Sequence, residues 1–225
     1  MKLLKTGKTK DVYELEDGNI LLRFKDDATI NEDGKLDPGG NTVGASIEGL
    51  GRASLKMTKY YFEKINASGE FTHYISCDPE GATMTVRRAE NFGRGVEMIC
   101  RLKAVGSFLR RYGDYCDEGQ DLGLLVEVSL KDDERGDPMI TADTLEMLGI
   151  MSVSEYECLK SLTKRVTTII RDDLAEKGLE LYDIKVEFGK ISGEVALIDE
   201  ISSGCMRVYK DGVWVQSLEL DRYFE

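Results

Sequence analysis

Alternating charged side chains near the C-terminal end are the residues best placed to do chemistry. Asp183, Lys185 and Glu187 alternate with apolar residues in LYDIKVEFG, so a strand here would carry all three charges on one face. A hairpin through a three-residue loop at Ile191–Gly193 would set Lys185 opposite Asp199, with Glu187 diagonally nearby. Two carboxylates beside a lysine can hold Mg²⁺ against phosphate groups. The same alternation is typical of a strand with a solvated charged face, so both interpretations stay open.

Two lysines near the N-terminus form a second candidate site. Gly7-Lys8-Thr9-Lys10 precedes a strand predicted at Val12–Leu15. In extended backbone Lys8 and Lys10 would point to the same side, toward a phosphate. The segment lacks the G-x-x-x-x-G-K-[ST] spacing of a P-loop, and a solvated basic turn is the alternative.

Further candidates lie in the middle of the chain. EMICRLKAVGSFLRRYG (residues 97–113) is typical of a strand, a small-residue turn and a basic helix, where Ser107 and Arg101 could bind a phosphate or carboxylate. An ordinary strand-to-helix connection is the alternative. The segment EVSLKDDERGDP, which contains Lys131, mixes both charges around a turn and by itself indicates only a solvated surface.

Short strands must position the N-terminal candidates. Strands at Val12–Leu15 and Ile20–Phe24 are predicted to form a hairpin through an Asp-Gly turn. Residues 26–51 are rich in Gly, Asp and Asn and predict a long mobile loop. Apolar spacing from Leu55 to Ile65 then predicts a helix that ends near Ser68-Gly69.

The rest of the chain mixes helices with strands. Strands are predicted at Thr83–Arg87 and Val96–Cys100, with a hinge between them. The clearest helix is predicted from Ser154 to Lys177, with Ser154 and Glu157 as its capping box. We therefore predict two domains, at residues 1–90 and 91–225.

Composition excludes several classes of protein. The chain has 225 residues, 41% of them hydrophobic, and a net charge of −12, which disfavours broad binding to nucleic acid or anionic lipid. It shows no apolar run long enough for a membrane span and no signal peptide, so we expect a cytoplasmic protein. Five scattered cysteines and one histidine do not predict a zinc site or a disulfide framework.

Six segments, taken in order, resemble the SAICAR synthetases, also called phosphoribosylaminoimidazole-succinocarboxamide synthases. They are GKTKDVY, FKDDAT, EMICRLKAVGSFLRRYG, VEVSLKDDERGDPMI, LYDIKVEFG and LIDEIS, and they extend from Gly7 to about Arg207. The resemblance implies a two-lobed α+β fold, with an antiparallel-sheet N-terminal lobe, a larger mixed C-terminal lobe and ATP in the cleft between them. It also implies condensation of CAIR with L-aspartate through an acyl phosphate, in purine biosynthesis.

The resemblance implies a role for each candidate residue. Lys8, Lys10 and Lys131 would contact ATP, Glu187 and Asp199 would bind Mg²⁺, Lys185 and Asp183 would be catalytic, and Arg101, Ser107 and Arg207 would bind the ribotide. The partners would be small-molecule substrates, with no nucleic acid and no membrane, and a homodimer is expected because family members commonly associate.

Departures from the family pattern fall on the side of the acceptor substrates. Gly204 stands where the family has an acidic residue, and Leu50 replaces a lysine. The sequence also stops at Glu225, where members usually continue into a further helix. A related ATP-dependent ligase or phosphotransferase with another substrate is therefore an alternative, as is a non-catalytic nucleotide-binding protein.

Overall fold

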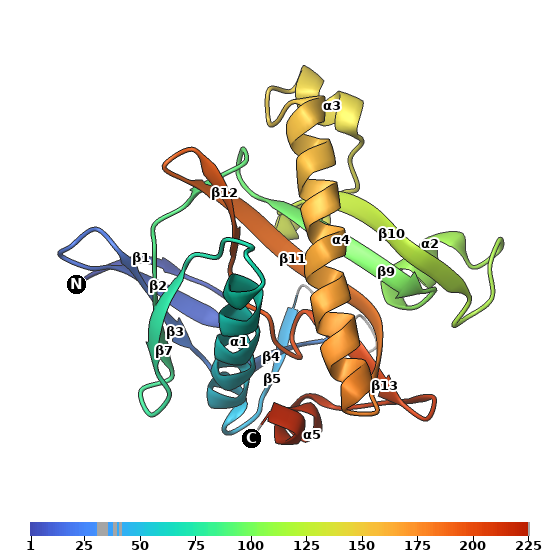
Figure 1. Ribbon diagram of the computed structural model, residues 1–225, viewed down its shortest axis with the longest axis horizontal. Coiled ribbons are helices and arrows are strands. Elements are labelled where there is room, and N and C mark those ends of the chain that lie inside the picture. Colours follow the sequence, from blue (N-terminus) through green and yellow to red (C-terminus); the bar gives the residue numbers. More distant parts are fainter. Residues whose placement is uncertain (31–35, 38–39, 41, 225) are drawn as a thin grey trace. The chain divides into compact units, whose positions relative to one another are not determined.

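The computed structural model describes residues 1–30, 36–37, 40 and 42–224, and it combines helices with antiparallel sheets (Figure 1). This confirms the α+β class. The chain forms two compact units: unit 1 comprises residues 1–90, 191–205 and 216–225, and unit 2 comprises residues 91–190 and 206–215. Unit 1 thus takes in two C-terminal segments that the sequence-based division at residue 90 assigned to the second domain. Within these described ranges, no helix is long and apolar enough to cross a membrane.

Unit 1 is built on a five-stranded antiparallel sheet with the order β1-β2-β3-β7-β6. Its strands are β1 (Lys2–Thr6), β2 (Lys10–Glu14), β3 (Ile20–Phe24), β6 (Tyr74–Asp78) and β7 (Thr83–Val86). The predicted hairpin is confirmed, because Gly18 has a φ of 84° and the Leu15 N–H donates to the Asn19 carbonyl at 2.9 Å. The strand β12 (Glu194–Ile198) also belongs to this unit.

Helix α1 (Leu50–Ala67) contacts β3 and β6 and buries one side in unit 1. Leu55, Tyr61 and Ile65 are fully buried, and the helix ends at Ser68, before Gly69 with its φ of 93°. The predicted end of this helix is confirmed. Leu50 is the first residue of α1 and is buried.

The C-terminal segment packs against the same helix. It consists of α5 (Ser217–Asp221) and the single turn η2 (Arg222–Phe224). The Phe224 ring centroid lies 5.2 Å from that of Tyr60 and 5.3 Å from that of Tyr61. An aromatic cluster therefore holds this end of the described chain on α1.

Part of the predicted loop at residues 26–51 is regular structure. Strands β4 (Asp27–Ile30) and β5 (Thr42–Ser46) pair antiparallel in a separate two-stranded sheet, so the loop prediction is wrong there. Residues 31–35, 38–39 and 41 lie outside the described residues.

Unit 2 contains an antiparallel sheet with the order β10-β9-β11-β13-β14. These strands are β9 (Val96–Lys103), β10 (Asp121–Leu130), β11 (Glu180–Ile191), β13 (Met206–Lys210) and β14 (Val213–Trp214). Helix α4 (Val153–Glu176) crosses this sheet and contacts β9 and β10 (Figure 1). The remaining elements are β8 (Glu90–Asn91), α2 (Gly106–Tyr112), η1 (Asp133–Arg135) and α3 (Ala142–Met147).

The start of α4 differs from the prediction. Ser152 is its N-cap, and Ser152 and Glu155 form the capping box, so the predicted box at Ser154 and Glu157 is wrong by two residues. Both pairs have the required spacing of three. The structure uses the earlier pair, in which Glu155 also forms an ion pair with Lys190 on β11.

Candidate functional site

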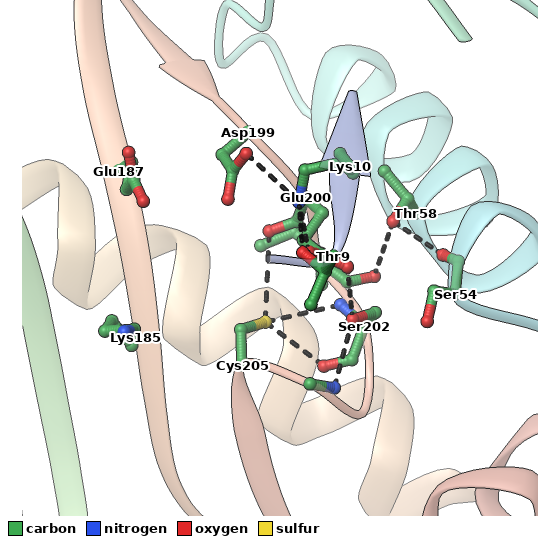
Figure 2. Close-up of polar contacts among 12 residues, drawn as sticks. Thr9, Lys10, Ser54, Thr58, Lys185, Glu187, Asp199, Glu200, Ser202 and Cys205 are labelled. Atoms are coloured by element: carbon green, nitrogen blue, oxygen red, sulfur yellow. Dashed lines mark hydrogen bonds and ion pairs between the residues drawn. The ribbon is translucent and has the colours of Figure 1, made fainter. Parts of the chain in front are cut away.

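A buried lysine lies between two carboxylates in unit 1 (Figure 2). The ammonium group of Lys10 forms an ion pair with Glu200, and its Nζ lies 3.2 Å from Asp199 Oδ1 and 3.4 Å from Thr9 Oγ1. The Glu200 side chain is 10% exposed and that of Asp199 is 31% exposed. Pairing with carboxylates offsets the cost of burying the ammonium group, and of the two carboxylates Asp199 is the more exposed.

The turn after β12 holds Glu200 in place. Ser202 Oγ donates to Glu200 Oε2 at 2.6 Å and accepts the Gly204 N–H at 3.0 Å. The Cys205 thiol donates to the Ser202 carbonyl at 3.1 Å and accepts the Ser202 N–H at 3.3 Å. Burial, and then the nearby Glu200 carboxylate, raises the pKa of Cys205 to about 12, so this thiol stays neutral. The turn is therefore closed by its own side chains.

Helix α1 fixes the same turn from the other side. Thr58 Oγ1 is fully buried and lies 3.2 Å from the Ile201 carbonyl, to which it can donate, and 2.7 Å from the Ser54 carbonyl (Figure 2). The shorter contact is the usual bond of a helical threonine to the preceding turn of its own helix. The longer contact places Ile201, between Glu200 and Ser202, directly against α1.

The backbone ahead of Lys10 is a turn. The Gly7 N–H donates to the Lys10 carbonyl at 2.8 Å, and a Cβ at position 7 would lie 2.6 Å from that oxygen. Lys8 and Thr9 lie in this bend, so the extended segment that was predicted to align Lys8 with Lys10 is not formed. Glycine is needed at position 7 because the backbone approaches itself closely there.

Asp199 follows β12 in a left-handed conformation with a φ of 67°. The ring of His73 is hydrogen-bonded to the Asp199 backbone, and burial lowers the pKa of His73 to about 4 despite the nearby Asp199 carboxylate. His73 is therefore neutral at pH 7 and supports the backbone that carries Asp199.

The loop between β11 and β12 has two residues, not three. Ser192 and Gly193 have φ values of 53° and 86°, as in a tight hairpin turn of the I′ type. The predicted three-residue loop is wrong by one residue, so the pairing of Lys185 with Asp199 that was counted from it no longer follows.

One face of the unit 2 sheet carries the other predicted residues. On β11, Asp183 pairs with Arg101 of β9, and Glu187 pairs with Glu97. On β13, Arg207 pairs with Asp183 from the other side. The alternating residues Ile184, Val186 and Phe188 are buried, which confirms the predicted one-sided strand.

Arginines and carboxylates form a cluster on this face. Arg101 is 1% exposed and donates to Glu127 at 2.5 Å, to Asp183 at 2.9 Å and to Ser107 Oγ at 2.8 Å. Arg207 donates to the same Asp183 oxygen at 2.6 Å. The structure thus brings together the three residues to which the resemblance assigned ribotide binding, and it places Asp183 among them.

Two other residues shape this arginine cluster. Arg111 donates to both oxygens of Glu127, at 2.8 and 2.9 Å. Gly106 has a φ of 55°, and a Cβ there would lie 2.6 Å from the Arg207 guanidinium. The predicted small-residue turn is confirmed at Ala104 and Val105, whereas Gly106 and Ser107 already belong to α2. Gly106 lets the Arg207 guanidinium lie against the backbone.

Lys185 and Glu187 belong to a neighbouring set of ion pairs. Lys185 Nζ lies 2.9 Å from Glu97 Oε1, Ser129 Oγ donates to Glu97 at 3.4 Å, and Lys131 forms an ion pair with Glu187. Burial disfavours the charge of Lys185, but Glu97 and then Glu187 outweigh it and raise its pKa. Lys185 is therefore a cation at neutral pH.

The two predicted metal ligands offer the right donor atoms for Mg²⁺. Glu187 and Asp199 are partly exposed carboxylates, and Mg²⁺ takes hard oxygen ligands. Among the residues that the structure describes, no group of three or more His, Cys, Asp and Glu side chains could hold a metal. Each carboxylate by itself fits one ligand position of an ion that completes its shell with phosphate oxygens and water.

Sequence reasoning missed several supporting residues: Glu97, Glu127, Glu200 and Ser202. All four stand inside or at the edge of the segments that carry the resemblance. For Glu97 the signal is its even spacing from Arg101 and Lys103 along β9, whereas β10 carries only Asp121 and Glu127 and gives no such signal for Glu127. For Ser202 no local signal exists, since a serine after Asp-Glu-Ile is also typical of an ordinary turn.

Known proteins resemble this chain along almost its whole length. The profile of the SAICAR synthetase family matches residues 3–222. A phosphoribosylaminoimidazole-succinocarboxamide synthase of Clostridium tetani is 56% identical over 224 residues, which cover 99% of this chain and 98% of that protein.

Two solved structures also match. One, a SAICAR synthetase, is 36% identical with a TM-score of 0.80, and the match covers 93% of this chain and 86% of that one. The other, a SAICAR synthetase in complex with ADP, is 30% identical with a TM-score of 0.83, and the match covers 97% and 88% of the two chains.

Proposed function

Because this chain belongs to the SAICAR synthetase family, we propose that it condenses CAIR with L-aspartate and ATP to give SAICAR, ADP and phosphate. The observation that carries the proposal is the convergence of Arg101, Ser107 and Arg207 on one face of unit 2. Two guanidinium groups and a hydroxyl suit the phosphate of a ribotide, because the planar fork of arginine matches phosphate oxygens. Asp183 would hold both arginines in place.

Lysines would bind the nucleotide. We assign Lys8, Lys10 and Lys131 to the phosphates of ATP, and Glu187 and Asp199 to Mg²⁺. The support is the fixed ammonium group of Lys10 beside Asp199, together with the lysine already paired to Glu187. Bound Mg²⁺ would supply charge neutralisation at the phosphate oxygens.

The reaction would pass through an acyl phosphate. An oxygen of the CAIR carboxylate attacks the γ-phosphorus, and the bond to the leaving ADP oxygen breaks. The aspartate amine then attacks the acyl carbon, phosphate leaves, and the amine loses a proton. Since Lys185 is cationic, we assign it to the negative charge on the transferring phosphoryl oxygens and not to proton abstraction.

We also propose that the enzyme works in the cytoplasm on free small-molecule substrates, as a homodimer. Sedimentation equilibrium at micromolar concentration tests the last point, and a monomer there would contradict it.

One assay tests the reaction. The protein is incubated with ATP, Mg²⁺, CAIR and aspartate, and ADP and SAICAR are followed together by chromatography. We expect both products in equal amounts. Nucleotide binding without either product, under conditions in which a known synthetase works, would contradict the proposal. ADP release that depends on another amine would overturn the choice of aspartate and keep the ligase class.

A further inference from the structure

We propose that Ser202 is a positioning residue for Lys10, acting through Glu200, and that it thereby sets the affinity for nucleotide phosphates. The inference rests on the proposed function in one respect, since it takes Lys10 as a phosphate contact. The chain of contacts runs from Ser202 to Glu200 to Lys10 within unit 1 (Figure 2).

The hydroxyl hydrogen of Ser202 can point in only one useful direction. Its oxygen accepts the Gly204 N–H at 3.0 Å, and the Glu200 carboxylate lies 2.6 Å away. A hydroxyl has one donor, and the residue is fully buried, so that donor must go to Glu200 Oε2.

Glu200 then has a different partner on each oxygen. Oε2 accepts from Ser202, and Oε1 faces Lys10 Nζ and lies 3.5 Å from Thr9 Oγ1. A glutamate side chain has three rotatable bonds, and hydrogen bonds to both of its oxygens fix the orientation of the carboxylate plane. Without Ser202, Oε2 would be a buried acceptor with no donor, and the carboxylate would turn to recover one.

Ser202 is itself held by residues other than Glu200. Its N–H donates to Cys205 Sγ, and its carbonyl accepts the Cys205 N–H at 3.1 Å. The preceding carbonyl, of Ile201, faces Thr58 of α1. Ser202 can therefore fix Glu200, because its own position does not depend on the ion pair.

The position of Lys10 matters because two carboxylates compete for it. Glu200 is the buried partner, whereas Asp199 is the partly exposed one. If Glu200 turns away, the ammonium group is drawn toward Asp199, where it neutralises a group that we assign to the metal and is no longer directed at a phosphate. The arginine cluster of unit 2 shares no residue with this chain of contacts.

The experiment measures binding of Mg·ADP by calorimetry, together with KM for each substrate. For Ser202→Ala we expect the Kd for Mg·ADP and the KM for ATP to rise about tenfold, with the KM for CAIR changed less than twofold. Ser203→Ala is the matched control, since within the described chain the Ser203 side chain makes no hydrogen bond. An unchanged Kd in Ser202→Ala overturns the proposal, and so does an equal rise in every KM.

A double-mutant cycle distinguishes an effect of Ser202 on the position of Lys10 from a general loss of structure. If Ser202 acts through Lys10, Ser202→Ala should change the Kd less than twofold in a Lys10→Met background. A full tenfold effect in that background overturns the proposal. ADP binding requires no chemistry, so a protein that binds ADP without making SAICAR would refute the proposed function and leave this test intact.

A second variant covers the case in which Ser202→Ala does not fold, as judged by its thermal unfolding. Glu200→Gln keeps the shape of the side chain and a partner for Ser202 but removes the charge that holds Lys10. It should raise the Kd for Mg·ADP at least tenfold, and a Kd equal to that of the wild type overturns the proposal.

Discussion

The charged clusters of the two units hold their cations in opposite ways. In unit 1 one lysine is surrounded by two carboxylates, Asp199 and Glu200, so the cluster is net negative. In unit 2 three arginines share two carboxylates, Asp183 and Glu127, so the cluster is net positive.

This difference indicates what each cluster can bind. A site with excess carboxylate accepts an anion only together with a metal cation, as when Mg²⁺ accompanies a nucleotide. A site with excess guanidinium binds an anion directly, and its planar forks fix the orientation of that anion. One chain can therefore bind phosphate groups in two ways, together with a metal ion in unit 1 and directly through arginines in unit 2.

Removing the charge of Asp199 should have the largest effect. For Asp199→Asn we expect kcat to fall on the order of 10³-fold, because the proposed metal loses a ligand and Lys10 loses a partner. The measurement is ADP release at saturating substrates over a range of Mg²⁺ concentrations. Asp211→Asn is the control, since Asp211 is exposed and also has a positive φ, of 50°. Unchanged turnover in Asp199→Asn would refute the metal assignment.

Removing Arg101 should affect stability more than any other change to the unit 2 cluster. Arg101→Met leaves Asp183 and Glu127 without their buried partner, which costs about 3–5 kcal/mol of unfolding free energy. Arg111→Met also removes a partner of Glu127, but that side chain is 30% exposed, and we expect a loss of at most about 1 kcal/mol. Urea denaturation measures both. Equal losses would mean that burial does not distinguish the two arginines.

Each cluster also depends on one glycine, which gives a smaller test. Gly106→Ala places a Cβ against the Arg207 guanidinium at a positive φ, and we expect a loss of about 1–2 kcal/mol and a higher KM for CAIR. Gly7→Ala places one against the Lys10 carbonyl, and it should raise the KM for ATP.

A third glycine supplies the control for these variants. Gly212→Ala shares the positive φ of Gly106, with a φ of 76°, but among the described residues no atom lies within 4 Å of the new Cβ. It should lower stability without changing either KM. If Gly106→Ala behaves like Gly212→Ala in both measurements, close packing at Arg207 has no functional consequence.

The smallest effect is expected at Gly204, where an acidic residue is expected from the sequence. Within the part of the chain that the structure describes, a Cβ there would meet only Ser202 Oγ, at 3.3 Å, so Gly204→Asp should change stability by less than about 0.5 kcal/mol. The KM for ATP should stay the same, and the KM for aspartate or CAIR should change if the acceptor side uses this position. A large loss of ATP affinity would instead connect position 204 to Ser202 and Lys10.

Local pattern determined much of this protein from the sequence alone. The alternation of Asp183, Lys185 and Glu187 predicted a one-sided strand, and Asp-Gly predicted the hairpin between β2 and β3. The C-terminal end of α1 and the turn before α2 were also predicted. All of these depend on residues a few positions apart, whose geometry is fixed by the backbone itself.

Tertiary structure decided the points at which local sequence offers equal choices. Two Ser-x-x-Glu pairs could cap α4, and Lys190 pairs with the glutamate of the earlier one. Two loop lengths could close the hairpin after β11, and the structure has the shorter loop, in which Ser192 adopts a left-handed conformation. Lys10 pairs with Glu200, which is 190 residues away in the sequence. Ser202 holds Glu200 in place, but its local sequence does not differ from that of an ordinary turn serine. These partners are determined by the need to pair charges that folding buries, and the spacing of residues along the sequence does not show which charges will meet.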